Sequence, residues 1–554
     1  MRHKLLATLC FILAITAFSQ TRNNATHPEY DLVIRGARVL DGTGNPWFYA
    51  DVGVTGERIA RIGRIPEKGK REIDAAGMYL TPGFIDMHSH SDYTLLVDGN
   101  AESKLRQGVT TEILGEASSA APRCPAAQPE DDAATQPYKV VPDWQDFRGY
   151  FARLEKQGIA LNVASYVGSG RIRLCGMGAD DRPPSPEELD RMRKLVDDAM
   201  RQGAIGLASG LIYPPNSFAK TDELIELGKV AGQYGGIYTS HIRNEGGGVI
   251  RAVDEAIEIG EKGHLPVHIL HIKVSGQNNW GRMKELIEHI QAARDRGMEI
   301  SADQYPYIAS STGLSTRLPD WALDGGIPKL VERVKDPGTR QRIIAQMQSS
   351  PYNWNLAVIA MVRQPQNKQY EGKSIAQVAQ MRGKPPEETT LDLLGEENGT
   401  VRMVFFSMSE DDVRYAMRVP WISVGSDGSS FKPEGVLGQG KPHPRSYGTF
   451  ARVLSKYVRD DKVISLEEAV RKMSSLAARQ VHFADRGEIR QGAFADLLVF
   501  DLNKIKDNST FEDPHHLAEG MSYVIVNGKV VLENGRYAGV KPGKVIRGAG
   551  AQIP

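Results

Sequence analysis

The hydrophobic positions in the middle of the chain form short β-branched runs, and helical stretches separate each run from the next. This alternation is typical of a parallel sheet whose strands are joined by helical crossovers. The predicted fold class is α/β, with the eight strands that a (β/α)8 TIM-like barrel requires. We place these strands at residues 84–88, 109–114, 161–167, 205–209, 237–241, 267–271, 299–303 and 422–427.

One intervening helix carries a clear start signal. Ser185 is followed by Pro186 and Glu188, which suit the N-cap, the first helical position and the third helical position. Apolar residues then recur at helical spacing from Met192 to Met200, so we expect one face of this helix to be buried.

Both ends of the chain contain short β segments separated by turn signals. Residues 31–40 and 495–500 are two such segments, and Asn527 with the following glycine predicts a hairpin turn. We therefore predict a small β-sandwich domain formed by both termini, from residues 30–80 and 485–550.

The catalytic barrel is then expected at residues 81–484. Within it, the stretch from about 313 to 401 is too long for a single crossover between two strands. We predict an insertion there, part of which could lie over the barrel mouth.

The first residues have the pattern of a secretory signal peptide. A basic stretch at residues 2–4 precedes an apolar run at 5–17, and Ala17 and Ser19 are the small residues that a signal peptidase reads. The run is too short to span a bilayer. We predict that residues 1–19 are removed and that the protein is exported, to the periplasm or outside the cell. An uncleaved N-terminal anchor is the alternative.

The length and charge of the chain limit its domain organisation and the classes of partner it can bind. The 554 residues favour a large catalytic domain plus a smaller one. The 68 basic and 68 acidic residues cancel, so no basic field is available to hold nucleic acid or an anionic membrane. We expect no nucleic-acid partner and no membrane contact beyond the signal peptide. The oligomeric state stays open.

Two cysteines, Cys124 and Cys175, lie outside the signal-like segment. Two cysteines do not make a disulfide framework. We expect two ordinary thiols, and the possibility that they pair in an oxidising compartment stays open.

Histidine and aspartate fall at the ends of the predicted strands. His88 and His90 lie two residues apart at the end of the first strand, so both side chains face the same way. His241, His271 and Asp427 end the fifth, sixth and eighth strands. Because the C-terminal strand ends of such a barrel meet at one place, we predict that these five side chains converge. Imidazole and carboxylate are the usual donors for Zn²⁺ or a similar ion, so the sequence predicts a metal site.

A sixth candidate ligand follows the second strand. Glu112 and Glu116 share one face by the period of two, but only Glu116 lies at the C-terminal end. We predict that the Glu116 carboxylate bridges two ions. The alternative is a loop glutamate that pairs with a cation or caps a helix.

Two other histidines receive different assignments. His268 lies three residues before His271, at the wrong level of its strand, and is expected to be structural. His443 belongs to the loop after the eighth strand and could therefore lie near the site.

Several motifs recur together in one known family. The segment Thr81-Pro-Gly-Phe-Ile-Asp-Met-His-Ser-His90 is similar to the metal-binding signature of the amidohydrolase superfamily. The chain resembles more specifically the D-aminoacylases, or N-acyl-D-amino-acid deacylases, from about Tyr30 to Tyr537. The supporting motifs are Arg106-Gln-Gly-Val-Thr-Thr-Glu112, Ser240-His-Ile-Arg243, His271-Ile-Lys273, Asp303-Gln-Tyr-Pro-Tyr307 and Gly425-Ser-Asp-Gly428.

This resemblance implies a barrel with a small β domain and a site for one or two divalent ions, with zinc as the expected metal. It implies that one ion is held by His88, His90 and Asp427. The other is then held by His241 and His271 together with a bridging side chain.

The chain departs from the family pattern at the bridging position. Many D-aminoacylases carry a cysteine in a Gly-Asn-Cys-Gly segment after the second strand, whereas this chain reads Gly115-Glu-Ala-Ser118. Glu116 is the nearest substitute. Losing a soft thiolate weakens the case for zinc alone, so the identity and number of the ions stay open.

The implied reaction is hydrolysis of the amide bond of an N-acyl-D-amino acid, which releases a carboxylate and a free D-amino acid. A divalent ion would lower the pKa of a water molecule towards neutrality. Asp427 would accept the proton of that water as general base and deliver it to the leaving nitrogen. Tyr213 would help to stabilise the tetrahedral oxyanion.

The free carboxylate of such a substrate requires a cationic clamp. Lys273 lies two residues beyond His271, on the same face by strand parity. Tyr305 and Ser311 resemble the family's substrate-binding residues, and Arg445 is a further candidate in the loop after strand eight.

Two alternatives to this function stay open. The substrate could be a dipeptide or another cyclic or linear amide, because a fold does not determine its substrate. The protein could also be a non-catalytic, secreted small-molecule-binding protein, although all the principal candidate ligands are intact.

Overall fold

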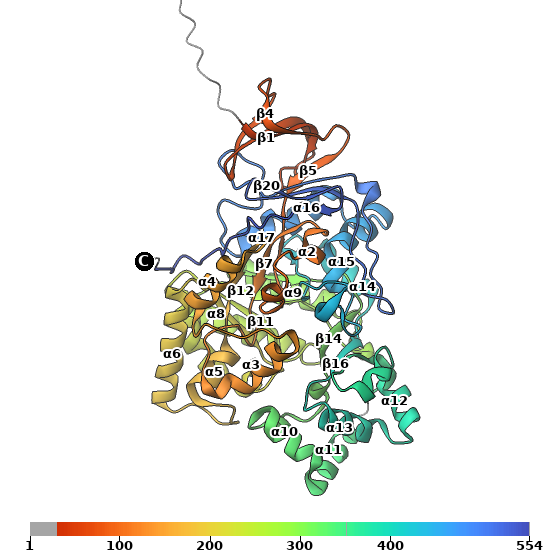
Figure 1. Ribbon diagram of the computed structural model, residues 1–554. Helices are drawn as coiled ribbons and strands as arrows, with labels where there is room; N and C mark the ends of the chain where they lie inside the picture. Colours follow the sequence, from red (N-terminus) through yellow and green to blue (C-terminus); the bar gives the residue numbers. More distant parts are fainter. Residues whose placement is uncertain (1–29, 351, 553–554) are drawn as a thin grey trace, which may run out of the picture.

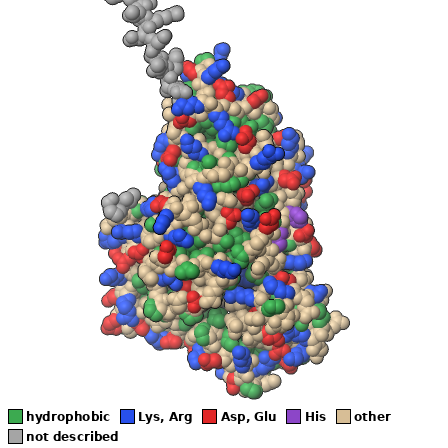
Figure 2. Space-filling view, viewed as in Figure 1, with side chains coloured by type: hydrophobic (Ala, Val, Ile, Leu, Met, Phe, Trp, Pro, Cys, Tyr) green, Lys and Arg blue, Asp and Glu red, His purple; other side chains and the backbone are tan. Residues whose placement is uncertain are grey.

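The computed structural model describes residues 30–350 and 352–552, so the predicted signal peptide lies outside the described residues. A large β sheet lies at one end of the molecule, a barrel in the middle, and the helices α10 to α13 at the other end (Figure 1). The described part of the chain contains no helix that is long and apolar enough to cross a membrane. Acidic and basic side chains are interspersed over the face shown in Figure 2, as the balanced charge leads one to expect.

The central barrel confirms the predicted fold class. Its parallel pairings run in the orders β6-β7-β8 and β9-β10-β11-β12-β13-β17, and an isolated parallel bridge between Ser89 and Gly428 joins the two ends. Since β8 and β9 are separated by one residue, the described chain contributes eight strand positions. The bounds are β6 (Phe84–Asp86), β7 (Val109–Leu114), β8 (Asn162–Ser165), β9 (Val167–Gly168), β10 (Gly206–Gly210), β11 (Ile237–His241), β12 (Val267–Ile269), β13 (Ile300–Gln304) and β17 (Ile422–Val424).

Helices cover the outside of the barrel, and one of them begins as its sequence predicts. The helix α6 starts at Pro186 after a capping box in which Ser185 and Glu188 satisfy each other's backbone N–H groups. Met192 and Met200 face inward from α6 and are buried. The main barrel helices are α4 (Phe147–Gln157), α5 (Ser169–Met177), α6 (Pro186–Arg201), α7 (Thr221–Gly232), α8 (Val249–Gly263), α9 (Met283–Asp295), α14 (Glu410–Arg418), α15 (Arg445–Arg452) and α16 (Leu466–Met473).

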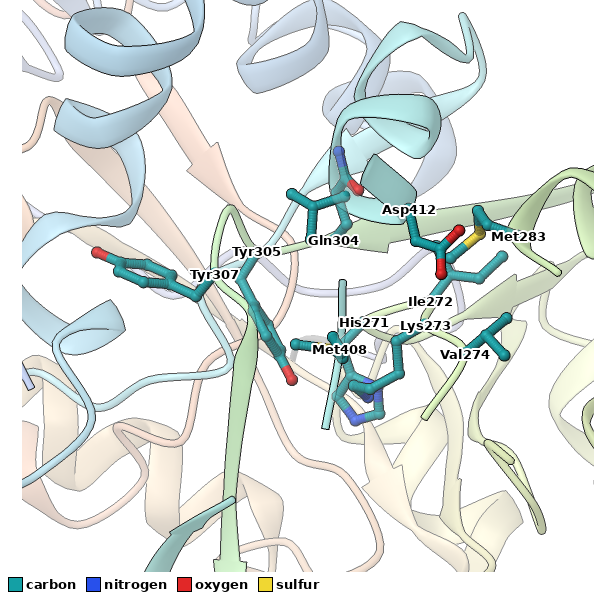
Figure 3. Close-up of a pocket in the computed structure, with 11 residues that line it drawn as sticks. His271, Ile272, Lys273, Val274, Met283, Gln304, Tyr305, Tyr307, Met408 and Asp412 are labelled. Atoms are coloured by element: carbon teal, nitrogen blue, oxygen red, sulfur yellow. The ribbon is translucent and has the colours of Figure 1, made fainter. Parts of the chain in front are cut away.

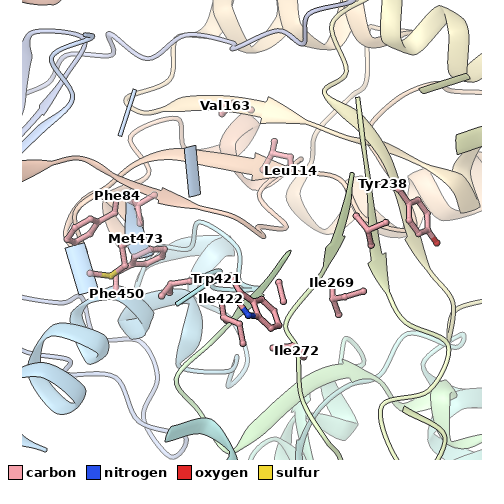
Figure 4. Close-up of a cluster of buried hydrophobic side chains, with 14 of the residues drawn as sticks. Phe84, Leu114, Val163, Tyr238, Ile269, Ile272, Trp421, Ile422, Phe450 and Met473 are labelled. Carbon is pink, nitrogen blue, oxygen red and sulfur yellow. The ribbon is translucent and has the colours of Figure 1, made fainter. Parts of the chain in front are cut away.

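The principal hydrophobic core lies between the strands and these helices. Phe84 of β6 stacks on Phe450 of α15 with ring centroids 5.9 Å apart, and both side chains are fully buried. Leu114, Val163 and Ile269 come from three other strands of the same cluster (Figure 4). This packing fixes the strands from outside and leaves their C-terminal ends to carry polar side chains.

Strands from both ends of the chain form one nine-stranded sheet within the described residues. The strand β5 (Tyr79–Pro82) lies between β1 (Tyr30–Val39), which runs parallel to it, and β18 (Leu497–Phe500), which runs antiparallel. The first and last parts of the chain are therefore hydrogen-bonded to each other. The remaining strands are β2 (Phe48–Thr55), β3 (Arg58–Gly63), β4 (Gly69–Asp74), β19 (Met521–Val526), β20 (Lys529–Glu533) and β21 (Arg536–Tyr537).

Between β13 and β17 the chain leaves the barrel and builds a separate layer. Three antiparallel strands, in the order β14-β16-β15, pack with four helices around a hydrophobic cluster of their own. The bounds are β14 (Ala309–Gly313), β15 (Ala357–Met361), β16 (Arg402–Phe406), α10 (Gly326–Lys335), α11 (Pro337–Ser349), α12 (Ile375–Arg382) and α13 (Pro386–Glu396).

The expectation of two ordinary thiols is wrong. Cys124 and Cys175 form a disulfide with an Sγ–Sγ distance of 2.08 Å. The bond ties the long loop after β7 to α5, which the chain reaches 51 residues later. The pairing could not be predicted from the spacing of the two cysteines, because the disulfide depends on how α5 packs against that loop.

Candidate metal centre and active site

The predicted ligands lie at or just beyond the C-terminal ends of barrel strands. His241 is the last residue of β11, whereas β12 and β17 end two and three residues before His271 and Asp427. His271 and Asp427 have φ angles of 38° and 49°, in the left-handed region that residues other than glycine rarely adopt. The predicted sixth and eighth strands were therefore slightly too long, because the backbone has left the extended conformation at both residues.

The six predicted metal ligands come together in three overlapping groups. The carboxylate of Glu116 lies at the centre, with Oε1 3.1 Å from His241 Nδ1 and Oε2 3.4 Å from His90 Nε2. In each group the candidate ligand atoms lie within 4.8 Å of one another. The groups are His88, His90 and Glu116; His88, His271 and Asp427; and Glu116, His241 and His271.

The protonation states of two candidate ligands suit metal binding. Burial lowers the pKa of His88 to about 3, so this imidazole is neutral. Burial alone would raise the pKa of Glu116, but its close contact with His241 and its interactions with the neighbouring histidines lower it to about 2. Neutral imidazole and ionised carboxylate are the forms that coordinate a cation.

Several of these atoms have no hydrogen-bond partner in the described part of the chain. Five of these buried atoms lack a partner among the described residues: both ring nitrogens of His88, both ring nitrogens of His241, and Glu116 Oε1. Buried polar atoms are otherwise almost always paired, and leaving one unpaired costs about 1–3 kcal/mol. Such a set of orphaned nitrogen and oxygen donors fits a divalent metal ion.

A buried network that the sequence reading did not identify holds the first, second and eighth strand ends together. Lys104 Nζ donates to Asp86 Oδ2 at 2.8 Å and to Ser426 Oγ at 2.8 Å, and it lies 3.2 Å from Glu112 Oε1. All four side chains are buried. Lys104 comes from the short helix α2 (Glu102–Leu105), so only the tertiary fold shows that it fixes the strands carrying His88 and Asp427.

Gly425, which opens the Gly-Ser-Asp-Gly motif, is required by close packing. A Cβ atom at this position would lie 2.6 Å from Asp303 Oδ1 and 3.1 Å from His88 Cβ. Asp303 accepts a hydrogen bond from the backbone N–H of His271 at 3.0 Å and contacts His268 Nε2 at 2.9 Å. The contacts of His268 fit its predicted structural role.

A cavity of about 450 Å³ opens beside the candidate ligands, within the range of small-molecule sites. Among the predicted substrate-binding residues, Tyr213, Ser311 and Arg445 line it, as does His443. Arg445 Nη1 lies 2.8 Å from Asp427 Oδ2. Ser311 belongs to β14, so the insertion supplies one wall of the cavity.

Two predicted substrate-binding residues, Lys273 and Tyr305, lie one layer further out and are absent from the described lining of that cavity. Lys273 Nζ is 2.7 Å from His271 Nδ1 and 2.5 Å from Glu245 Oε1. Figure 3 shows Lys273 and Tyr305 beside the His271 ring, and Lys273 Nζ lies 5.6 Å from the Tyr305 ring centroid. Sequence reasoning missed Glu245, although its spacing of four from His241 was visible.

A TIM-like barrel with imidazoles and carboxylates gathered at its C-terminal strand ends defines the class of metal-dependent barrel hydrolases. Comparison with known proteins agrees. Residues 71–532 match the amidohydrolase family, and the chain belongs to this family. The N-acyl-D-glutamate deacylase of Alcaligenes xylosoxydans xylosoxydans is 34% identical over 521 residues, which cover 94% of this chain and 97% of that protein.

Solved structures place the chain beside the D-aminoacylases. The zinc complex of N-acyl-D-glutamate deacylase from Bordetella bronchiseptica with a phosphonate inhibitor is 32% identical, with a TM-score of 0.80. A D-aminoacylase described as having a binuclear metal centre is 33% identical, with a TM-score of 0.78. Each match covers 94% of this chain and 100% of the other. The predicted resemblance is thereby confirmed.

Proposed function

We propose that this protein hydrolyses the amide bond of N-acyl-D-amino acids with the help of a divalent metal. One observation carries the proposal: four imidazoles, three of them buried, and two buried carboxylates converge beside a substrate-sized cavity in a chain 34% identical to an N-acyl-D-glutamate deacylase. The products would be a carboxylate and a free D-amino acid.

The metal would be held by the six residues of the three overlapping groups. His88, His90 and Asp427 form one half of the site, and His241 and His271 form the other, with Glu116 between them. This nitrogen and oxygen set suits zinc and also the other first-row divalent metals, for one ion or two. When bound, such an ion supplies Lewis-acid activation of water and of the acyl carbonyl.

Asp427 is in the ionised form that can accept a proton. Burial alone would raise the pKa of its carboxyl group, but the charge of Arg445 and the nearby histidines hold this pKa well below its usual value. The group is therefore a carboxylate at neutral pH and can act as a base. Its Oδ1 lies 3.0 Å from His90 Nε2, so these two side chains can contribute to one metal site.

Other side chains would hold the substrate. Burial raises the pKa of Tyr213, so its hydroxyl stays protonated and can donate to a developing oxyanion. Thr312 donates to that hydroxyl oxygen at 3.1 Å and holds it in place. Arg445 and Ser311, on the cavity wall, suit the carboxylate of the amino acid, with Tyr305 and Lys273 behind them.

A substrate screen combined with metal analysis tests this function. Purified protein is assayed with N-acetyl-D-amino acids, their L-enantiomers, dipeptides and cyclic amides, and its metals are counted by mass spectrometry. We expect hydrolysis of D-substrates, loss of activity after chelation, and recovery on adding Zn²⁺. A protein without divalent metal, or one acting only on L-substrates, would contradict the proposal. Ligand binding by metal-free protein, without hydrolysis on adding Zn²⁺, would favour the binding-protein alternative.

We also propose that the protein is exported to the periplasm or beyond. The signal-like residues 1–19 suggest it, and the bond between Cys124 and Cys175 supports it, because disulfides persist in oxidising compartments. Cell fractionation with N-terminal sequencing of the mature protein tests the proposal. An intact N-terminus in the cytosolic fraction would contradict it.

A further inference from the structure

Glu245 reaches the outer side of the candidate metal centre. It follows His241 by four residues, in the loop between β11 and α8, and its side chain is 15% exposed. Its Oε1 lies 3.3 Å from His271 Nδ1, 3.7 Å from His241 Nε2 and 2.5 Å from Lys273 Nζ. One carboxylate oxygen therefore faces the rings of two candidate ligands at once.

The two imidazoles turn opposite nitrogens towards the centre of the site. His241 directs Nδ1 inward, 3.1 Å from Glu116 Oε1, whereas His271 directs Nε2 inward, 3.9 Å from the same oxygen. The nitrogen that faces outward is thus Nε2 in His241 and Nδ1 in His271. Both outward nitrogens face Glu245.

An imidazole that coordinates through one nitrogen carries its proton on the other, and that N–H requires an acceptor. For His271 the acceptor at hydrogen-bonding distance is Glu245. The distance to His241 Nε2 is longer than a hydrogen bond, so there Glu245 acts through its charge. An ionised carboxylate in this position also makes both rings better donors.

Lys273 completes the arrangement as a counter-ion. Lys273 Nζ lies 2.7 Å from His271 Nδ1 and donates to this nitrogen when it carries no proton. Once His271 coordinates a metal through Nε2, its Nδ1 is protonated, and both groups are then donors that require an acceptor. Both can donate to the single Oε1 of Glu245. The lysine charge compensates that carboxylate, which would otherwise be largely buried without a full partner.

We propose that Glu245 is a positioning residue of the metal centre: it fixes the ring orientation and the coordinating nitrogen of His271, supports His241 electrostatically, and is neutralised by Lys273. This proposal rests on the metal centre of the proposed function. It adds a partly buried carboxylate and a new role for Lys273 to the six predicted ligands.

Metal affinity, rather than activity, is the decisive measurement. Zn²⁺ binding to wild type and Glu245→Gln is measured by competition with a chromophoric chelator, and the absorption spectrum of the Co²⁺ form reports the coordination geometry. We expect Glu245→Gln to bind Zn²⁺ about 10–100-fold more weakly and to change the Co²⁺ spectrum. The matched control is Glu255→Gln, which removes the carboxylate paired with Arg243 at 2.8 Å and should leave both readouts unchanged.

A second variant separates contact from charge. Glu245→Asp keeps the charge but withdraws it by one methylene group, so its Zn²⁺ affinity should lie between those of wild type and Glu245→Gln. Wild-type affinity and a wild-type Co²⁺ spectrum in Glu245→Gln would overturn the proposal. If Glu245→Gln does not fold, the same result in Glu245→Asp would overturn it. Wild type that binds no divalent metal would instead refute the proposed function itself.

Discussion

Replacing Glu116 by glutamine removes one negative charge from the centre of the site and keeps the shape of the side chain. Its carboxylate oxygens lie 3.1 Å from His241, 3.4 Å from His90, and 3.9 Å from both His88 and His271. We predict that Glu116→Gln binds fewer divalent ions than wild type, because an amide is a weak and neutral substitute for a bridging carboxylate.

The size of the effect follows from Coulomb's law. Two unit charges about 4 Å apart interact with about 4 kcal/mol at an effective dielectric constant of about 20. A divalent ion doubles this figure, and since about 1.4 kcal/mol corresponds to a tenfold change in affinity, the loss of one unit charge weakens binding by roughly a thousandfold or more. We therefore expect dialysed Glu116→Gln to retain at least one ion fewer per protein molecule than wild type.

The assay combines metal content after dialysis with Zn²⁺ affinity from chelator competition. Glu130→Gln is the matched control, because Glu130 lines the same cavity and makes no ion pair with a histidine in the described part of the chain. Glu116→Cys places a thiolate, a strong zinc ligand, at this position and should bind zinc again. Wild-type metal content and affinity in Glu116→Gln would refute the reasoning.

Three further predictions test other parts of the structure. Asp427→Asn should lower kcat by about 10²–10⁴-fold, measured at saturating metal, because the proton acceptor is lost; wild-type kcat would exclude a proton-transfer role. Replacing both Cys124 and Cys175 by serine should lower the free energy of unfolding by about 2–4 kcal/mol, measured in urea, because the bond closes a loop across a sequence separation of 51; an unchanged unfolding midpoint would contradict this. Burial lowers the pKa of Lys472 to about 7 from its ordinary value of 10.5, so between these pH values the unfolded chain alone keeps the proton and stability rises with pH. Denaturation of Lys472→Met should lack this slope of up to about 1.4 kcal/mol per pH unit, and an identical slope would count against the assignment.

The barrel was predictable because its signal repeats along the chain. Each of the eight predicted strands overlaps an observed one, since β-branched runs alternate with helical spacing. The predicted strand ends were less accurate at His271 and Asp427, where the backbone adopts left-handed φ angles. The insertion was visible only as excess length, and its own sheet and core depend on pairings that no local pattern records.

The candidate ligands were predictable for a geometric reason. Once eight strands close into a barrel, residues at their C-terminal ends must meet, however distant they are in sequence. No such rule locates Lys104, which lies on a short helix, or Glu245, which lies on a loop. Their roles come from contacts between elements, as does the bond between Cys124 and Cys175.

The pairing of β5 with β18 also affects how the protein is made. Roughly 400 residues separate the two strands, so at about 5–20 residues per second a ribosome needs on the order of 20–80 s to supply the second after the first. Throughout that interval the nascent chain carries an open sheet edge that can pair with a neighbouring polypeptide. Keeping the chain unfolded until its last strands emerge avoids this hazard, and deleting those strands would leave the edge permanently bare.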